Sequence, residues 1–329
     1  MRRAIVSLLA MTVVLSGCSQ PPHRFAGWPD LPATLAADPA PPDLPASGSV
    51  GRGALVLAST AGVVVVLEDG RQFRLPPPPP DEGRQGRTMA SLSPDGRWLG
   101  YRRSGHRGDR RYLIRDLLGD AVVPVDATPG RWSPDARFLL AAEPAMAPTT
   151  LIEPATGEVR SVDASGMVGV LPDGRLVTVD ITDTALRMAA GPTVREVTLG
   201  PPPDYECWCP AGVAVAPGLD AVTVLLRHRS GIVPGTSEKS APLPGNPARL
   251  VVVDRDTGTQ RHRVDLPAGE GEVWSLLADT GAGVLVRRRG PDVGELVLVD
   301  PTSGARRVVL RPPHGVLLAV PGEVLNDGE

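Results

Sequence analysis

The chain has 329 residues, of which 42% are hydrophobic and 22% are charged, and its formal net charge is −3. These values are typical of a globular protein with one large domain or two ordinary ones, and they exclude an intrinsically disordered chain. Because a mildly acidic chain gains nothing from neutralising phosphate groups, nucleic acid is not expected as a partner.

The N-terminal residues have the pattern of an export signal. Arg2 and Arg3 give a positive start, and residues 4–15 form an apolar run. This run is too short for a membrane-spanning helix, which needs about 20 apolar residues. The tetrapeptide Leu-Ser-Gly-Cys at residues 15–18 resembles the bacterial lipobox. The resemblance implies cleavage before Cys18 and attachment of diacylglycerol to its thiol.

We therefore expect residues 1–17 to be a lipoprotein signal peptide and Cys18 to be the lipid attachment site of a palmitate-bearing protein. Such a protein is exported and held on a bacterial membrane, outside the cytoplasm. An ordinary secreted protein is the alternative, and the choice between inner and outer membrane stays open. Residues 18–52 are rich in Pro and Ala, which favours an extended, solvated tether over loose packing on the domain.

From Gly53 onward the sequence repeats two short β patterns. The first consists of an apolar strand, a Pro-Asp-Gly type of turn and a second strand, with sharp copies at 91–101, 131–141 and 169–179. Proline presets φ in a tight turn, and Asp and Gly tolerate the backbone that follows. We expect the recurring aspartates to make turns and not to bind ligands; they are Asp95, Asp135, Asp173, Asp254 and Asp300.

The second pattern is a hairpin of β-branched residues around a polar turn, best seen at 250–260 and 296–306. Two hairpins supply four strands, the content of one propeller blade. The turn prolines Pro94, Pro134 and Pro172 lie 40 and 38 residues apart, close to the repeat of about 40–45 residues in propellers. The sequence therefore predicts an all-β propeller over residues 53–329.

The repeats predict six blades of four antiparallel strands each. Five blades are complete in the sequence, at about 88–125, 130–162, 167–199, 212–264 and 273–310. The sixth is expected to combine residues 53–75 with a C-terminal strand such as Val316–Val320. Pairing of these N- and C-terminal strands would close the ring and cover both sheet edges.

Two copies of the turn carry a family resemblance. The segments Ser-Pro-Asp-Gly-Arg-Trp at 93–98 and Ser-Pro-Asp-Ala-Arg-Phe at 133–138 look like the repeat of TolB-type six-bladed propellers. The Gly-His and Trp-Asp marks of eukaryotic WD40 repeats are missing. The resemblance implies the propeller fold and a protein-binding platform, and it implies no site residues.

The predicted topology places the long loops on one face of the ring. The tight turns join first to second and third to fourth strands, so they share one face, while loops 76–87, 103–111, 200–211 and 227–248 belong to the other. Because function concentrates on loops held by a rigid scaffold, the last two loops are the candidate binding loops. Their candidate residues are Asp204, Tyr205, Glu206, Trp208, Arg227, His228 and Arg229.

Cys207 and Cys209 are a candidate disulfide, because an exported location permits one. Only one residue separates them, so the bridge would close a tight ring, and a free dithiol or an intermolecular bridge stays open. A plug that folds over the blade, stiffened by this bridge, is the alternative to a binding loop. The five histidines are scattered and no cofactor motif is present, so neither metal nor cofactor is expected.

The favoured function is a non-catalytic platform that binds another envelope protein through the long-loop face. An extracytoplasmic hydrolase or lyase in the central channel is one alternative. An accessory module of an envelope sensor or transporter is another. The channel-lining segments Met89–Ser93, Gly130–Ser133 and Met167–Leu171 supply few titratable groups, which disfavours catalysis. Whether a small molecule binds stays open.

Overall fold

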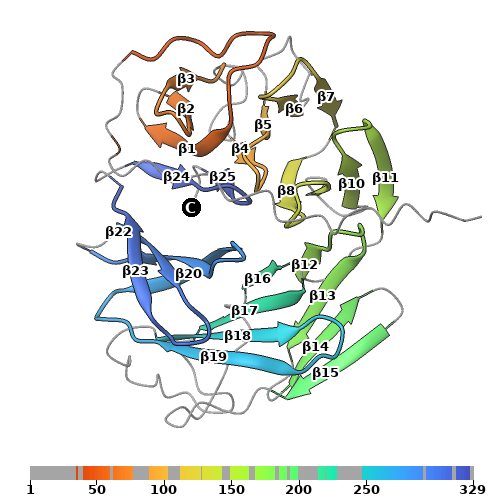
Figure 1. The fold of residues 1–329 in the computed structure, drawn as a ribbon, viewed down its shortest axis with the longest axis vertical. Coiled ribbons are helices and arrows are strands. Elements are labelled where there is room, and N and C mark those ends of the chain that lie inside the picture. The colour runs from red at the N-terminus through yellow and green to blue at the C-terminus, as the bar shows by residue number, and fades with distance from the viewer. Residues whose placement is uncertain are drawn as a thin grey trace, which may run out of the picture.

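The computed structural model describes residues 35, 40–59, 62–76, 89–102, 112–126, 128–142, 149–162, 167–181, 185–190, 193–198, 214–218, 220–227, 247–291, 294–312 and 316–326. The regular elements in these ranges are all β-strands, and they form six antiparallel sheets that stand around a common centre (Figure 1). No helix among these residues is long and apolar enough to cross a membrane.

The first three sheets are formed by the N-terminal half of the chain together with two C-terminal strands. Sheet 1 has the order β24-β1-β2-β3, with β1 (Gly53–Ser59), β2 (Gly62–Leu67), β3 (Gln72–Arg74) and β24 (Leu317–Ala319). Sheet 2 has the order β25-β4-β5-β6-β7, with β4 (Met89–Leu92), β5 (Trp98–Arg102), β6 (Tyr112–Asp116), β7 (Val122–Val125) and β25 (Val324–Asn326). Sheet 3 contains β8 (Thr128–Trp132), β9 (Leu139–Ala142), β10 (Thr149–Glu153) and β11 (Glu158–Val162).

The other three sheets follow in chain order. Sheet 4 contains β12 (Met167–Val170), β13 (Leu176–Ile181), β14 (Ala185–Ala190) and β15 (Thr193–Thr198). Sheet 5 contains β16 (Ala214–Pro217), β17 (Ala221–Arg227), β18 (Ala248–Asp254) and β19 (Gln260–Leu266). Sheet 6 contains β20 (Val273–Asp279), β21 (Val284–Arg289), β22 (Gly294–Val299) and β23 (Arg306–Leu310).

The prediction of six blades of four strands each is wrong, although the predicted pairing of the N-terminal strand β1 with the C-terminal residues 316–320 is present. Five sheets of the described chain have four strands, but sheet 2 has five, because β25 pairs with β4 through Val324 and Ser91. The preceding strand β24 pairs with β1 of sheet 1. The C-terminal residues 316–326 are therefore divided between two sheets, and the arrangement is propeller-like without being a ring of equal blades.

A tight turn at residues 320–323 explains this division. The amide of Glu323 donates to the carbonyl oxygen of Val320 at 3.0 Å, and Gly322 between them has a φ of 84°. This positive φ suits glycine, which has no Cβ to clash. The amide of Gly322 also donates to Leu92 O at 2.7 Å, which attaches the turn to sheet 2. The chain thus reverses between the two sheets.

Apolar side chains between neighbouring sheets form the core. Trp98 and Ile114 of sheet 2 pack in one cluster with Trp132 of sheet 3. Between sheets 6 and 1, Leu285 clusters with Leu318, so the first and last sheets are also in contact. Burial of large apolar side chains is the main favourable term in folding, and here it is spread around the whole ring.

Residues 40–52, which we call the docking segment, pack against the outside of sheets 1 and 2. The amide of Leu44 donates to Arg74 O at 2.8 Å. The guanidinium of Arg115, only 1% exposed, donates to the carbonyl oxygen of Gly48 at 3.0 Å. The last part of the predicted 18–52 tether is therefore docked on the ring, where a solvated spacer was expected.

Candidate functional site

Most residues predicted to bind a partner lie outside the described residues. They are Asp204, Tyr205, Glu206, Cys207, Trp208, Cys209, His228 and Arg229. The lipid attachment residue Cys18 lies outside them as well. Arg227 is the last residue of β17 and pairs with Ala248, the first residue of β18. This pairing places both ends of the intervening connection at one end of sheet 5.

The tight turns at the opposite end of the sheets confirm the predicted role of their aspartates. In the turn after β4, Asp95 accepts hydrogen bonds from Ser93 Oγ at 2.5 Å and from the amide of Arg97 at 3.0 Å. Asp135 repeats this arrangement after β8, where Ser133 Oγ donates to it at 2.6 Å. These short bonds hold the turn backbone, as expected for Asp in tight turns. We call this end of the ring the tight-turn face.

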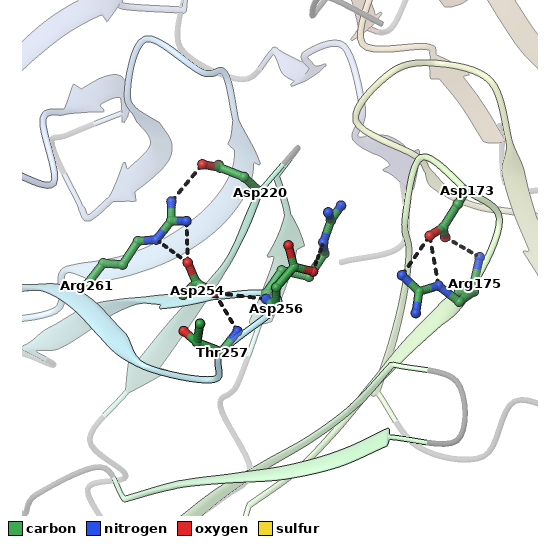
Figure 2. A network of polar contacts seen from close by, with 8 residues as sticks. Asp173, Arg175, Asp220, Asp254, Asp256, Thr257 and Arg261 are labelled. Atoms are coloured by element: carbon green, nitrogen blue, oxygen red, sulfur yellow. Dashed lines mark hydrogen bonds and ion pairs between the residues drawn. The ribbon is translucent and has the colours of Figure 1, made fainter. Parts of the chain in front are cut away.

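Figure 2 shows a polar network of this face, around the turn after β18. Asp254 accepts bonds from the amides of Thr257 at 2.6 Å and Asp256 at 2.9 Å, and from Arg261 Nε at 3.0 Å. Arg261 Nη1 also donates to Asp220 Oδ2 of the neighbouring turn at 2.8 Å. The Thr257 amide and the Arg261 guanidinium hold the pKa of Asp254 well below its usual range.

A similar pair, Asp173 with Arg175, appears beside this network in Figure 2. Arg175 donates its amide at 3.0 Å and its Nε at 2.8 Å to the same carboxylate. The carboxylates of the tight-turn face are thus engaged by the turns that carry them. Within the ranges that the structure describes, no three His, Cys, Asp or Glu side chains form a group that could hold a metal ion.

Charged side chains also meet near the centre of the ring, where β24 and β25 lie (Figure 1). Arg287 Nη2 donates to Leu318 O and to Glu323 Oε2, each at 2.7 Å. Burial raises the pKa of Glu323, and the charges of Arg287 and Arg289 oppose this shift. Arg131 on β8 lies within electrostatic reach of Glu323, and its side chain is exposed.

Sequence reasoning missed this central cluster. Arg131 lies within the segment Gly130–Ser133 that was expected to supply few titratable groups, and Glu323 comes from the C-terminal turn. A glutamate within a mostly apolar segment, Val316–Leu325, was the available signal. The sequence alone does not say that such a tail runs through the middle of the ring.

A hollow of about 410 Å³ between sheets 5 and 6 is the second feature that sequence reasoning missed. We call it the Trp274 groove. Its principal lining residues are Trp274, Arg288, Glu295, Val297, Arg306 and Val308. Its volume lies in the range of about 300–1,000 Å³ typical of ligand sites. Trp274, Arg288 and Glu295 lie near the strand ends opposite the tight turns, an end that we call the long-loop face. Arg306 begins β23 directly after the tight turn at residues 300–305, so the groove extends along the sheet toward the tight-turn face.

Comparison with known proteins gives distant structural likeness. No family model matches the sequence, and no curated protein does. TolB from Acinetobacter baumannii is 15% identical with a TM-score of 0.46, covering 82% of this chain. A putative TolB from Agrobacterium tumefaciens is 12% identical with a TM-score of 0.42, covering 84% of this chain and 99% of that one.

Two further solved structures show the same level of likeness. Kuenenia stuttgartiensis hydrazine synthase is 16% identical with a TM-score of 0.42, covering 80% of each chain. The β-propeller domain of Myceliophteria thermophila Cps50 (Swd1) is 17% identical with a TM-score of 0.36, covering 68% of this chain and 70% of that one. The present chain spans 65% of the length of the A. baumannii protein, slightly less than two thirds.

Proposed function

We propose that this protein is a lipid-anchored, extracytoplasmic platform that binds another envelope protein on its long-loop face. One observation carries the proposal. The charged side chains of the tight turns, such as Asp95 and Asp254, are engaged by their own turns. The strand ends that flank connections 103–111 and 228–246 lie on the opposite face, where a rigid scaffold can present them to a partner.

The N-terminal sequence supports the location. The lipobox-like residues that end at Cys18 follow an apolar run that is too short to span a membrane. Ser19 follows the cysteine and is compatible with sorting to an outer membrane. A single lipid chain binds membranes weakly, so a diacylated cysteine suits stable anchoring.

Crosslinking in intact cells, followed by membrane fractionation, tests both parts of the proposal. The unmodified protein should pellet with membranes and give a discrete crosslinked adduct. Cys18→Ala should release the protein from the membrane fraction. Trp208→Ala should keep it there but reduce the adduct by about tenfold, because an aromatic anchor carries much of an interface's binding energy.

Trp28→Ala is the matched control, since it removes the same side chain from the N-terminal segment and should change neither result. Membrane pelleting of Cys18→Ala would contradict the anchor. An unchanged adduct with Trp208→Ala would contradict the binding loop. The fractionation and the adduct are separate readouts, so each half of the proposal stands or fails alone.

A second candidate function is an enzyme that uses the centre of the ring. The partly buried carboxyl of Glu323 favours it, because burial raises its pKa against the opposing charges of Arg287 and Arg289, and perturbed pKa values are common at active sites. However, Glu323 accepts hydrogen bonds from Arg287 and from the amide of Val320, and both bonds hold the C-terminal turn in place. The platform is therefore the better-supported proposal.

A further inference from the structure

The Trp274 groove combines an apolar floor with an exposed apolar wall. Trp274 is 2% exposed and its Nε1 donates to Pro267 O at 3.0 Å, so the polar atom of the indole is satisfied within the protein. Val308 on β23 is directly paired with Val297 on β22 and shares its side of the sheet. Val308 is 37% exposed, which leaves apolar surface open at the rim of the groove.

Most charges in the groove are neutralised within it. Arg288 Nη2 lies 2.7 Å from Glu272 Oε1, and Arg288 Nη1 lies 3.6 Å from Glu295 Oε2. Glu295 also accepts a bond from Arg311 Nε at 3.0 Å. Arg306 forms no ion pair with another residue of the described ranges. The charge left available at the groove is therefore positive.

A smaller hollow of about 190 Å³, between sheets 3 and 4, has a different balance of charge. There Arg137 Nε bonds Glu153 Oε1 at 2.8 Å, and its guanidinium lies 4.8 Å from the centre of the Phe138 ring. Arg160 covers the same ring at 5.7 Å. The carboxylate of Glu158 also lines this smaller hollow, so beside Arg160 it leaves no net positive charge for an acidic ligand.

We propose that the Trp274 groove binds an extended, acidic segment of the partner protein. An apolar side chain of that segment packs on Val308 and Ala268, above the buried Trp274, and a neighbouring carboxylate pairs with Arg306. Alternate residues of an extended chain point to the same side, so an acidic-apolar pattern fits a groove that runs beside β23. This inference rests on the proposed platform function and adds a location and a partner chemistry to it.

The shape of the site favours a protein segment over a lipid surface. The apolar residues line a concave hollow, which a side chain can fill and a flat membrane cannot enter. β23 is the outermost strand of sheet 6, so an extended segment can approach along its free edge. Burial of an apolar side chain in the groove favours binding, and the pairing with Arg306 adds charge selectivity.

Fluorescence anisotropy tests this inference directly. The full-length protein is held in phosphatidylcholine nanodiscs and titrated against a fluorescein-labelled peptide of alternating Glu and Leu. We expect saturable binding that a Lys-Leu peptide does not reproduce. Arg306→Glu should weaken the binding by about tenfold or more, because reversing the charge repels the carboxylate. Val308→Ser should also weaken it, because the substitution removes apolar contact area.

Arg307→Glu is the matched control. It makes the same charge change one residue along β23, on the opposite side of the sheet, and should alter binding by less than about threefold. Equal effects of the two arginine variants, or equal binding of the Lys-Leu peptide, would overturn the inference.

Three outcomes distinguish this inference from binding to the membrane surface and from the proposed platform function. Displacement of the peptide by phosphatidylglycerol in the nanodiscs would assign Arg306 to the membrane surface and overturn the peptide groove. Absence of peptide binding, while Trp208-dependent adducts persist in cells, would overturn the groove and leave the platform intact. If the unmodified protein gives no crosslinked adduct in cells, that result would instead contradict the platform itself.

Discussion

Gly96 and Ala136 occupy the same position in two successive turns, but their surroundings differ. Both have a positive φ, 68° for Gly96 and 62° for Ala136. A Cβ on Gly96 would overlap the carbonyl oxygen of Gly53, whose amide donates to Gly96 O at 2.8 Å. Ala136 is 4% exposed, and its methyl group fits within sheet 3. The two turns therefore differ in how closely another segment approaches.

We predict that exchanging these two residues has unequal effects on stability. Gly96→Ala should lower the free energy of unfolding by about 2 kcal/mol or more, because backbone strain adds to the overlap with Gly53. Ala136→Gly should change it by less than about 1 kcal/mol, since relief of strain is offset by lost burial and a more flexible unfolded chain. Urea unfolding of both variants measures this, and equal losses would contradict the steric argument.

The C-terminal strands show what a single element contributes to the ring. β24 and β25 extend sheets 1 and 2, and the turn between them places Glu323 beside Arg287 of sheet 6. Three sheets are thus linked through residues 316–326. Because the Glu323 carboxyl is partly buried against Arg287, its protonation changes the stability of this link. Its ionised form faces Arg287, with the charges of Arg131 and Arg289 nearby.

The sign of the pH effect follows from the raised pKa of Glu323. The folded protein binds a proton at Glu323 more readily than the unfolded chain does. The stabilising contribution is therefore complete below pH 4.5, the ordinary pKa of a glutamate carboxyl. It is lost as the pH rises through the raised pKa. Glu323→Gln lacks the titrating group. Relative to the unmodified protein, the free energy of unfolding of Glu323→Gln should therefore increase as the pH rises above 4.5.

Urea unfolding between pH 4 and pH 8 measures this difference. Glu158→Gln removes a carboxyl from an exposed position on β11 and is the control for a general charge effect. A pH profile of Glu323→Gln that runs parallel to that of the unmodified protein would contradict the assignment.

At the scale of the whole molecule, the docking segment connects the N-terminal part of the chain to the rim of the ring. It hydrogen-bonds to sheet 1 through Arg74 and to sheet 2 through Leu117, whose carbonyl oxygen accepts from Val50 at 2.8 Å. Arg115 is fully buried beneath it. The chain that carries the lipid anchor proposed at Cys18 would therefore join the ring at sheets 1 and 2, away from the candidate loop of sheet 5.

We predict that Arg115→Ala releases the docking segment without unfolding the ring. Loss of the guanidinium leaves the Gly48 carbonyl oxygen without its donor, so local opening becomes more frequent. Limited proteolysis should then cut within residues 40–52 about tenfold faster, because cleavage follows the population of the open form. Arg137→Ala, which removes an ion pair on sheet 3, should leave this rate unchanged. Equal rates in the two variants would contradict the role of Arg115.

Much of the sheet content could be predicted because it depends on local patterns. The repeat at 91–101 contains the end of β4, its Ser-Pro-Asp-Gly turn and most of β5, and hydrogen bonds within a few residues determine that geometry. The predicted aspartate roles were confirmed for the same reason. The strand count of sheet 2 was not predictable in this way, because β25 pairs with residues more than 200 positions earlier.

The amino-acid sequence by itself determined that this protein is all-β, built from repeated hairpins whose aspartates serve turns. Only the tertiary structure decided how the C-terminal residues are shared between two sheets, where residues 40–52 dock, and that Trp274 and Val308 line one groove. The physical reason is the range of the interactions. A turn is stabilised by neighbours in the chain, whereas a groove and a sheet edge are formed by segments that are distant in the sequence.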